Sequence, residues 1–212
     1  MLSAVTASPP LPRSFFARDP LVVAPDLLGA VLVNEVDGVS VAVRITEVEA
    51  YLGEGEDPAS HSHRGLRPRN AVMFGPPGHL YVYFTYGMHW CANLVCRPDG
   101  VSGAVLLRAG EVVAGQGAAR SRRPAARREV DLARGPARLA SALALTGADN
   151  GRDLCDGGGL RVLAGEPYSP DRRRTGPRVG VTLGAASEWR FWLADEPTVS
   201  VYRPSQPRRR PQ

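Results

Sequence analysis

The sequence predicts a single α/β domain of the α+β type, in which short helices surround a curved, mainly antiparallel β-sheet with one protruding β-hairpin. Its 212 residues suit one domain with its own hydrophobic core. Strand-like segments of alternating apolar residues are joined by short glycine turns, which is typical of antiparallel hairpins. We expect an irregular N-terminal arm at residues 1–17, the folded domain at 18–203 and a disordered basic tail at 204–212.

The basic residues of the chain limit the reactions and partners that are compatible with it. The formal net charge is +5, and every basic residue is an arginine because the sequence contains no lysine. An imine with a sugar could therefore form only at the N-terminal amine. Arginine binds phosphate well, so the composition is compatible with a nucleic-acid partner. A genome composition that favours arginine codons explains the absence of lysine equally well.

The cysteines and the hydrophobic segments indicate an intracellular protein. Cys91, Cys96 and Cys155 are odd in number and form no CxxC pair, so neither a disulfide framework nor a zinc knuckle is predicted. The N-terminus lacks the positive charge that begins a signal peptide. No apolar run approaches the roughly 18 residues that a membrane span requires. We therefore expect a cytoplasmic location and no membrane partner.

The first elements are a helix and a hairpin. Asp19-Pro20 supplies an N-cap and a proline at the first helical position, and Gly29 can end this helix. A strand near Ala30–Val33 follows, and then the turn Asp37-Gly38. The next strand, Val41–Leu52, completes the hairpin.

The strand Val41–Leu52 carries the candidate chemistry. By simple alternation, Glu47, Glu49 and Tyr51 share one face with three β-branched residues, Val41, Val43 and Ile45. A carboxylate at the end of such an apolar row loses hydration, which raises its pKa toward the value that a general base needs. The alternative is that both carboxylates lie on a solvated end of the strand.

The segment 53–65 is a loop by composition and contains His61 and His63. A histidine on a glycine-rich loop beside a candidate active-site strand is a candidate for ligand binding or stacking. The two histidines could instead bind a metal together with Glu49 or Asp57, but no third ligand stands at a defined spacing. We therefore predict no metal site.

A second hairpin, rich in aromatic residues, is expected at residues 80–95. Leu80–Tyr86 alternates, so that Tyr81 and Tyr83 face one way, and Trp90–Val95 returns after the turn at Gly87. Tyr86 and Met88 then flank an exposed tip, where large apolar groups could act as a wedge between base pairs. The tip could also fold back over the core or contact a partner chain.

The second half of the chain gives weaker signals. We expect a strand at Gly103–Arg108, a loop and helix in the arginine-rich segment 115–134, and a helix from Gly135 to Gly147. Two further strands are expected near Arg178–Leu183 and Thr198–Tyr202.

Together these features fit an enzyme that removes a base from DNA. The bond between base and sugar is hidden in a duplex, so the nucleotide must swing out and be held by aromatic rings. A carboxylate can then activate water and stabilise the positive charge that develops on the sugar. Three alternatives stay open: a noncatalytic binder of damaged DNA, a carbohydrate hydrolase with Glu47 and Glu49 as its pair, and a lyase that uses the N-terminal amine.

Several motifs also resemble those of the alkyladenine (3-methyladenine) DNA glycosylase family, in the same order over most of residues 20–202. They are EAYLG at 49–53, RN and MFG within 69–75, PGHLYVYFTYGMH at 77–89, Asn93, LLRA at 106–109, GPARLASAL at 135–143 and RVGV at 178–181. The resemblance implies that residues 18–203 form a monofunctional glycosylase domain without lyase activity. It also implies excision of alkylated or deaminated purines, such as 3-methyladenine, 7-methylguanine and hypoxanthine, in base excision repair.

The resemblance further implies roles for single residues. Glu49 corresponds to the general base, and Arg108 and the backbone carbonyl of Val179 to the groups that help hold the attacking water. The substrate-binding residues that it implies are Tyr51, His61 and Tyr83 as walls around the flipped base, with Asn93 screening against the guanine amino group. The DNA-binding residues that it implies are Tyr86 as the intercalating residue, with Met88, His89, Arg67 and Arg69.

The sequence departs from the family at two of these positions. Arg67 stands where members often have threonine, and His89 replaces a common aromatic residue. The resemblance implies no metal and no other cofactor. We expect a monomer that acts on double-stranded DNA containing damaged purines and is associated with the nucleoid in the cytoplasm.

Overall fold

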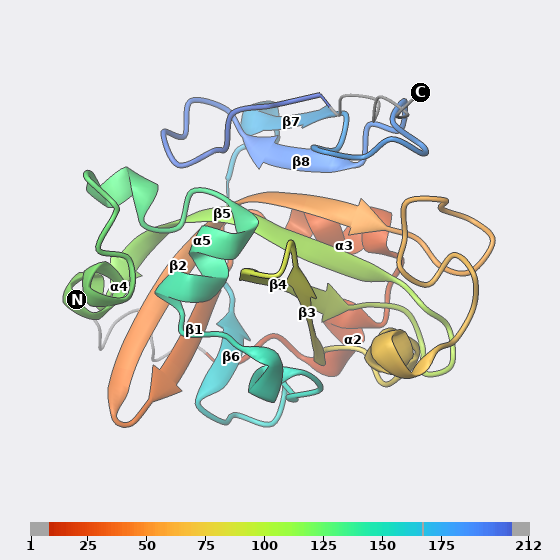
Figure 1. The fold of residues 1–212 in the computed structure, drawn as a ribbon, viewed down its shortest axis with the longest axis horizontal. Helices are drawn as coiled ribbons and strands as arrows, with labels where there is room; N and C mark the ends of the chain where they lie inside the picture. The colour runs from red at the N-terminus through yellow and green to blue at the C-terminus, as the bar shows by residue number, and fades with distance from the viewer. Residues whose placement is uncertain (1–8, 167, 205–212) are drawn as a thin grey trace.

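The computed structural model describes residues 9–166 and 168–204 and shows an α+β domain built on one curled antiparallel sheet (Figure 1). Its eight strands are β1 (Val31–Val36), β2 (Val39–Tyr51), β3 (Leu80–Thr85), β4 (His89–Val95), β5 (Ala104–Ala114), β6 (Leu160–Leu163), β7 (Arg173–Gly176) and β8 (Arg190–Leu193). All pairs of these strands are antiparallel. The predicted fold class is confirmed.

The helices are short. The α-helices are α2 (Arg13–Phe16), α3 (Pro20–Asp26), α4 (Gln116–Arg122) and α5 (Pro136–Ala142). The 3₁₀ helices are η1 (Pro68–Phe74), η2 (Glu129–Asp131), η3 (Gly147–Asp149) and η4 (Pro170–Arg172). In the described part of the chain, none of the helices has the length and apolar character needed to cross a membrane.

Strand β2 is the centre of the sheet, whose main path runs β3-β4-β5-β2-β1-β6. One edge of β2 pairs with β5 along almost its whole length. The other edge is divided, because β1 pairs with its first half and β8 pairs with Glu47, Val48 and Glu49. The two carboxylates of β2 therefore lie between β5 and β8, in the middle of the sheet.

The register of β2 on β5 shifts on both sides of Glu47. Ile45 pairs with Gly110, Glu47 with Ala109 and Val48 with Leu107, so Thr46 and Arg108 have no partner in the ladder. Such a bulge changes which side chains face the core. The arginine leaves the regular ladder beside the carboxylates, and this places its guanidinium next to them.

The bulge corrects one expectation from the sequence. Simple alternation put Glu47, Glu49 and Tyr51 on the same face as the β-branched residues that precede them. The main core instead contains Val41, Val43 and Ile45 from the first half of β2, and Val48 and Ala50 from the second half. The side chains of the two carboxylates therefore point away from the core face, because the inserted residue shifts the alternation by one position.

The N-terminal elements form as the sequence predicts. The side chain of Asp19 accepts a hydrogen bond from the backbone N–H of Leu21, at 2.9 Å, and caps α3 with Pro20 in its first turn. The turn between β1 and β2 has positive φ at both Asp37 and Gly38, the geometry that suits a two-residue hairpin. The core cluster holds apolar side chains of α3 and α5 against the sheet.

The hairpin of β3 and β4 pairs from Leu80–Leu94 to Thr85–His89. Tyr86 and Gly87 both have positive φ at its turn. That the hairpin protrudes from the molecule stays a prediction.

Other expectations are wrong in detail. Strand β5 does not end at Arg108 as expected but continues six residues further, to Ala114. Helix α5 ends at Ala142 rather than Gly147. The segments 178–183 and 198–202 are not strands, whereas β6, β7 and β8 were not predicted.

The two termini can be compared only in part. Within the arm expected at 1–17, residues 13–16 form α2, and Phe16 is buried in the core rather than in irregular chain. Residues 1–8 of this arm and 205–212 of the expected tail lie outside the described residues.

Gly110 offers a test of the close pairing between β2 and β5. An added Cβ would meet the side chain of Val43 and lie 2.5 Å from the carbonyl oxygen of Arg44. We expect Gly110→Ala to lower the free energy of unfolding by about 3 kcal/mol, because neither neighbour can move freely within the sheet. Denaturant titration measures this change.

Gly117 in α4 is the control, because an added Cβ there meets nothing within 4 Å. Gly117→Ala should raise the free energy of unfolding by about 0.5–1 kcal/mol, through the better helix propensity of alanine. Equal effects of the two substitutions would contradict the assigned register.

Candidate active site

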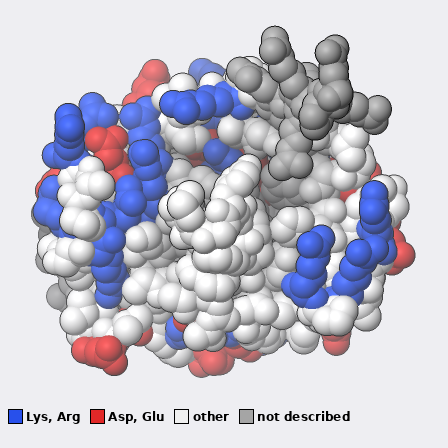
Figure 2. Space-filling view, in the orientation of Figure 1, with Lys and Arg blue, Asp and Glu red and all other residues white. Residues whose placement is uncertain are grey.

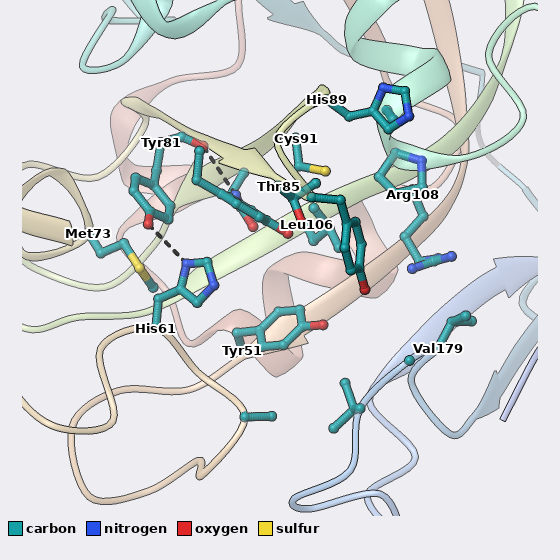
Figure 3. A pocket seen from close by; sticks show the side chains of 18 of the residues that line it. Tyr51, His61, Met73, Tyr81, Thr85, His89, Cys91, Leu106, Arg108 and Val179 are labelled. Atoms are coloured by element: carbon teal, nitrogen blue, oxygen red, sulfur yellow. Dashed lines mark hydrogen bonds between the residues drawn. The ribbon is translucent and has the colours of Figure 1, made fainter. Parts of the chain in front are cut away.

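A pocket of about 600 Å³ opens beside the second half of β2. The pocket is surrounded by the end of β2, the loop 53–65, the β3–β4 hairpin, β5 and the segment 179–183, with further contributions from η1 and the start of α5 (Figure 3). Its lining includes most of the predicted site residues, namely Tyr51, His61, Tyr83, Tyr86, His89, Asn93, Arg108 and Val179. The fold therefore brings together residues that lie more than a hundred positions apart in the sequence.

Glu49 lies behind the wall of this pocket and is fully buried. Its Oε1 accepts a hydrogen bond of 2.7 Å from the backbone N–H of Val179, and its Oε2 accepts one of 2.9 Å from the hydroxyl of Tyr51. The Nη1 of Arg108 lies 3.4 Å from Oε1. Because all three neighbours are donors, the site is arranged for an ionised carboxylate. All three also line the pocket, so Glu49 lies directly behind the pocket lining.

Burial and charge act together on Tyr51. Burial and the adjacent Glu49 carboxylate raise the pKa of Tyr51 well above its usual value. The phenol therefore keeps its proton at neutral pH and donates a hydrogen bond to Glu49.

Arg108 joins the two buried carboxylates of β2. Its Nε donates a 3.1 Å hydrogen bond to Glu47, while its Nη1 faces Glu49. Burial alone would lower the pKa of Arg108, but the charges of Glu49 and Glu47 outweigh it, and the pKa is raised. The guanidinium stays charged and fixed, with one side open to the pocket.

Glu47 is occupied by structural contacts. Its Oε1 accepts hydrogen bonds from the Nε of Arg190 at 2.6 Å and from the hydroxyl of Ser200 at 2.9 Å, and its Oε2 accepts one from the backbone N–H of Ser200 at 2.7 Å. Glu47 is fully buried and does not line the pocket. This geometry argues against the carbohydrate hydrolase in which Glu47 and Glu49 would form the catalytic pair.

The aromatic wall is built on β3 and the loop 53–65. The rings of His61 and Tyr83 meet edge to face, with centroids 4.6 Å apart, and Tyr81 stacks on Tyr83 at 5.9 Å. The Nδ1 of His61 lies 3.0 Å from the hydroxyl of Tyr81 (Figure 3). The backbone carbonyl of His61 accepts a 2.9 Å hydrogen bond from the Nδ2 of Asn70. His61 and Tyr83 thus form one side of a slot, and Tyr51 lies across from them.

The His61 ring is uncharged at neutral pH. Burial lowers the pKa of His61, and the nearby positive charge of Arg69 lowers it further. An uncharged ring can stack on a cationic base without repelling it.

Arg178 fixes Tyr51 and the loop 53–65 in place. Its fully buried guanidinium makes two hydrogen bonds to Asp57, of 2.6 and 2.9 Å, and lies between the rings of Tyr51 and Trp189, 4.5 and 4.9 Å from their centroids. A bidentate contact with aromatic stacking on both sides leaves the guanidinium little freedom. Residue 178 thereby also positions Val179, whose N–H contacts Glu49.

The predicted DNA-binding residues lie at the surface around the pocket. Tyr86 is 88% exposed and Met88 is 69% exposed, at the turn between β3 and β4. Arg67 and Arg69 are exposed at η1, and His89 lies between the hairpin and the pocket. Asn93 is buried at the pocket, where its Nδ2 donates to the carbonyl of Tyr81 at 3.1 Å.

Sequence reasoning missed several residues that build the site. Tyr81, Asn70, Asp57 and Arg178 orient its walls but were not predicted to have a role there. The only signal for Tyr81 was its shared face with Tyr83. Asn70 and Arg178 lie in the family motifs RN and RVGV, but no contact was predicted for them. Arg178 acts on Asp57 across 121 positions, which no local pattern reveals. The N–H of Val179 contacts Glu49, which was not predicted, and the role of the Val179 carbonyl in holding the attacking water stays a prediction.

The histidines of the loop 53–65 do not join Glu49 or Asp57 in a common cluster. Within residues 9–166 and 168–204, no three His, Cys, Asp or Glu side chains are grouped so that they could hold a metal ion.

The pocket combines a buried acid with aromatic walls, and comparisons with known proteins identify the family. The family model described as methylpurine-DNA glycosylase (MPG) matches residues 14–197. A protein of Streptomyces avermitilis named "Putative 3-methyladenine DNA glycosylase" is 56% identical, over 95% of both chains. Proteins with the same name from Frankia casuarinae and Leifsonia xyli are each 52% identical, over 92% and 96% of this chain and 93% and 97% of theirs.

The chain belongs to the methylpurine-DNA glycosylase family. It is therefore a DNA glycosylase, of the hydrolase class, whose substrate is DNA. The resemblance drawn from the sequence motifs is confirmed.

The network around Glu47 can be tested through stability. Replacing Glu47 with Gln removes the negative charge that Arg190 and Arg108 share, and leaves a buried guanidinium without its counter-charge. We expect the free energy of unfolding to fall by about 3 kcal/mol, measured by denaturant titration.

Glu111→Gln is the matched control, because Glu111 pairs with Arg44 at the surface, at 2.6 Å. Its effect should stay below about 1 kcal/mol. If Glu47→Gln cost no more than this control, the structural role of Glu47 would be wrong.

Proposed function

We propose that this protein flips alkylated or deaminated purines, of the 3-methyladenine, 7-methylguanine and hypoxanthine class, out of duplex DNA and hydrolyses their N-glycosidic bond. The observation that carries the proposal is the environment of Glu49: a buried carboxylate, held by Tyr51, Val179 and Arg108, directly behind an aromatic pocket. The enzyme would act as a monomer in base excision repair, at the nucleoid in the cytoplasm.

In the proposed reaction, Glu49 acts as the general base. A water molecule enters from the pocket beside Arg108 and Val179, transfers a proton to Glu49 and bonds through its oxygen to the anomeric carbon. The N-glycosidic bond breaks and its electron pair leaves with the purine, so that a cationic methylated purine departs neutral, whereas hypoxanthine departs as an anion and takes up a proton from water. The negative charge of Glu49 also stabilises the positive charge that develops on the sugar. The products are a free base and an abasic site in an intact strand.

The aromatic slot would hold the flipped base. Tyr51 would stack on one face of the purine, and His61 and Tyr83 would contact the other, one through its ring face and the other through its ring edge, because their rings are 78° apart. A methylated purine carries a positive charge, which favours contact with electron-rich aromatic faces. Asn93, buried at the pocket, would exclude the amino group of undamaged guanine.

The exposed hairpin turn would supply the wedge. A flipped nucleotide leaves a gap in the base stack, and an aromatic side chain that fills this gap compensates for part of the lost stacking. Tyr86 is suited to this position because it is exposed while also contributing to the edge of the pocket. Met88, His89, Arg67 and Arg69 would contact the groove and backbone around it.

We also propose that the enzyme is monofunctional. The chain has no lysine, so no side-chain amine can form an imine with the abasic sugar. Only the N-terminal amine could do so, and borohydride trapping of a protein–DNA adduct would reveal that activity.

The first test is Glu49→Gln, which removes the base and keeps the shape of the side chain. The single-turnover rate of excision from a hypoxanthine-containing duplex should fall by about 10²- to 10⁴-fold, while affinity for this duplex is retained. Glu111→Gln, at the surface, should leave both quantities unchanged. Full activity of Glu49→Gln would exclude Glu49 as the general base.

The second test is Tyr86→Ser, which removes the proposed wedge. Affinity for the damaged duplex should fall by about tenfold or more, because the extrahelical state loses a stacking partner. Flipping can be followed by the fluorescence of an etheno-modified purine. Tyr202→Ser serves as the control, since Tyr202 is also surface-exposed but does not line the pocket. An unchanged affinity for Tyr86→Ser would remove the wedge role.

A further inference from the structure

A second hollow lies next to the active-site pocket and is lined largely by arginine. Its volume is about 920 Å³, and it is lined by His89, Arg123, Ala125, Ala126, Arg127, Arg128, Asp131, Ala137, Arg138 and Ser141. His89 and Ala137 line both hollows, so the two are neighbours that share a wall. We name this second hollow the arginine groove.

Most of the arginine groove comes from the arginine-rich segment 115–134, to which the family resemblance assigned no role. Helix α4 and the segment that follows it provide Arg123, Arg127 and Arg128, and α5 provides Arg138. The core side chains Ala119, Leu132 and Leu139 anchor these elements to the sheet. The arginines therefore project from a fixed framework rather than from a loose loop.

Three of these arginines lack a partner carboxylate. Arg128 is paired with Asp131 at 2.9 Å. Among the residues that the structure describes, no carboxylate lies within 4.0 Å of Arg123, Arg127 or Arg138. The carboxylates of this segment instead pair with Arg120, Arg128 and Arg134. The groove is thus left with an excess of positive charge.

Arg123 and Arg138 are close enough for their positive charges to act on each other. Arg123 is partly buried, and its Nε is held by the carbonyl of Leu132 at 3.3 Å. Burial lowers the pKa of Arg123, and the like charge of Arg138 lowers it further. Two guanidinium groups that repel each other beside a hollow are stabilised by an anion that binds both. A planar fork of N–H donors suits the paired oxygens of a phosphate.

The surface view shows how this charge is distributed around the hairpin. Blue side chains gather over α4 and the chain after it, on the left of Figure 2, and a second, smaller group lies over η1 and the loop before it, on the right. The loop before η1 carries the exposed arginines Arg64 and Arg67, and η1 itself carries the exposed Arg69. An uncharged ridge separates the two groups (Figure 2). Positive charge therefore lies on both sides of the pocket region.

We propose that the arginine groove binds the sugar–phosphate backbone of duplex DNA next to the flipped nucleotide, with Arg123, Arg127 and Arg138 contacting phosphates. The inference rests on the proposed function, because it takes duplex DNA as the substrate. It adds a binding surface that holds the duplex while the aromatic slot selects the damaged base. Phosphate contacts carry no sequence information, so the groove acts equally on damaged and undamaged DNA.

A salt titration with undamaged duplex DNA tests the proposal directly. Each phosphate contact contributes about 0.9 to the slope of log K against log salt. The double variant Arg127→Gln/Arg138→Gln should reduce this slope by about 2 and weaken binding at low salt by about tenfold or more. Both residues are exposed and lie outside the Glu47 and Glu49 network, so the fold should be kept.

Arg161→Gln/Arg174→Gln is the matched control. It removes the same net charge from β6 and β7, at positions that line neither hollow. If the slope of log K against log salt is less steep for the groove variant than for the control, the proposal is supported. Equal slopes and affinities for the two variants would overturn it, because the effect would then come from net charge alone.

An excision assay separates this proposal from the proposed function. At saturating protein, the single-turnover excision rate of the groove variant should equal that of the unsubstituted protein. A slower rate at saturation would contradict a role confined to backbone binding. If the unsubstituted protein excised no base, the proposed function would fail, whereas the salt slopes on undamaged DNA would still decide the role of the groove.

Discussion

The site depends on Arg108, which lies between two buried carboxylates at the centre of the sheet. The Nε of Arg108 donates a hydrogen bond to Glu47, and its Nη1 lies 3.4 Å from the Oε1 of Glu49. This arrangement requires the register shifts on both sides of Glu47, because a regular ladder would include Arg108 in strand pairing. Glu47 is neutralised by two arginines and bonded to Ser200, so Glu49 is left as the carboxylate beside the pocket. The register shifts around Glu47 thus place Glu47 in a structural ion-pair network and Glu49 beside the pocket.

The walls of the pocket are held by contacts between distant parts of the chain. Arg178 clamps the loop 53–65 through Asp57 and stacks on Tyr51, and Tyr81 and Asn70 fix His61. Each contact joins a surface loop to a buried polar group, which limits the motions of the loop. The loops that surround the pocket are therefore held in place by buried contacts.

Local patterns in the sequence were sufficient for part of this structure. The Asp19 cap, the Asp37-Gly38 turn and the alternation of Tyr81 and Tyr83 all depend on near neighbours, and these elements form as predicted. The family motifs placed most of the site residues around one pocket. The inversion of faces along β2 could not be predicted, since a bulge depends on pairing with β5. The late strands were missed for a similar reason, because β8 is a four-residue strand that forms against Glu47–Glu49.

The most direct measurement is the identification of the released product. The protein, treated with a chelator, is incubated with methylated DNA and with a hypoxanthine-containing duplex, and the solution is analysed by chromatography. Our account predicts free methylpurine or hypoxanthine, an alkali-labile abasic site in an otherwise intact strand, and no adduct after borohydride treatment. Tight binding without any released base, or an adduct trapped by borohydride, would contradict it.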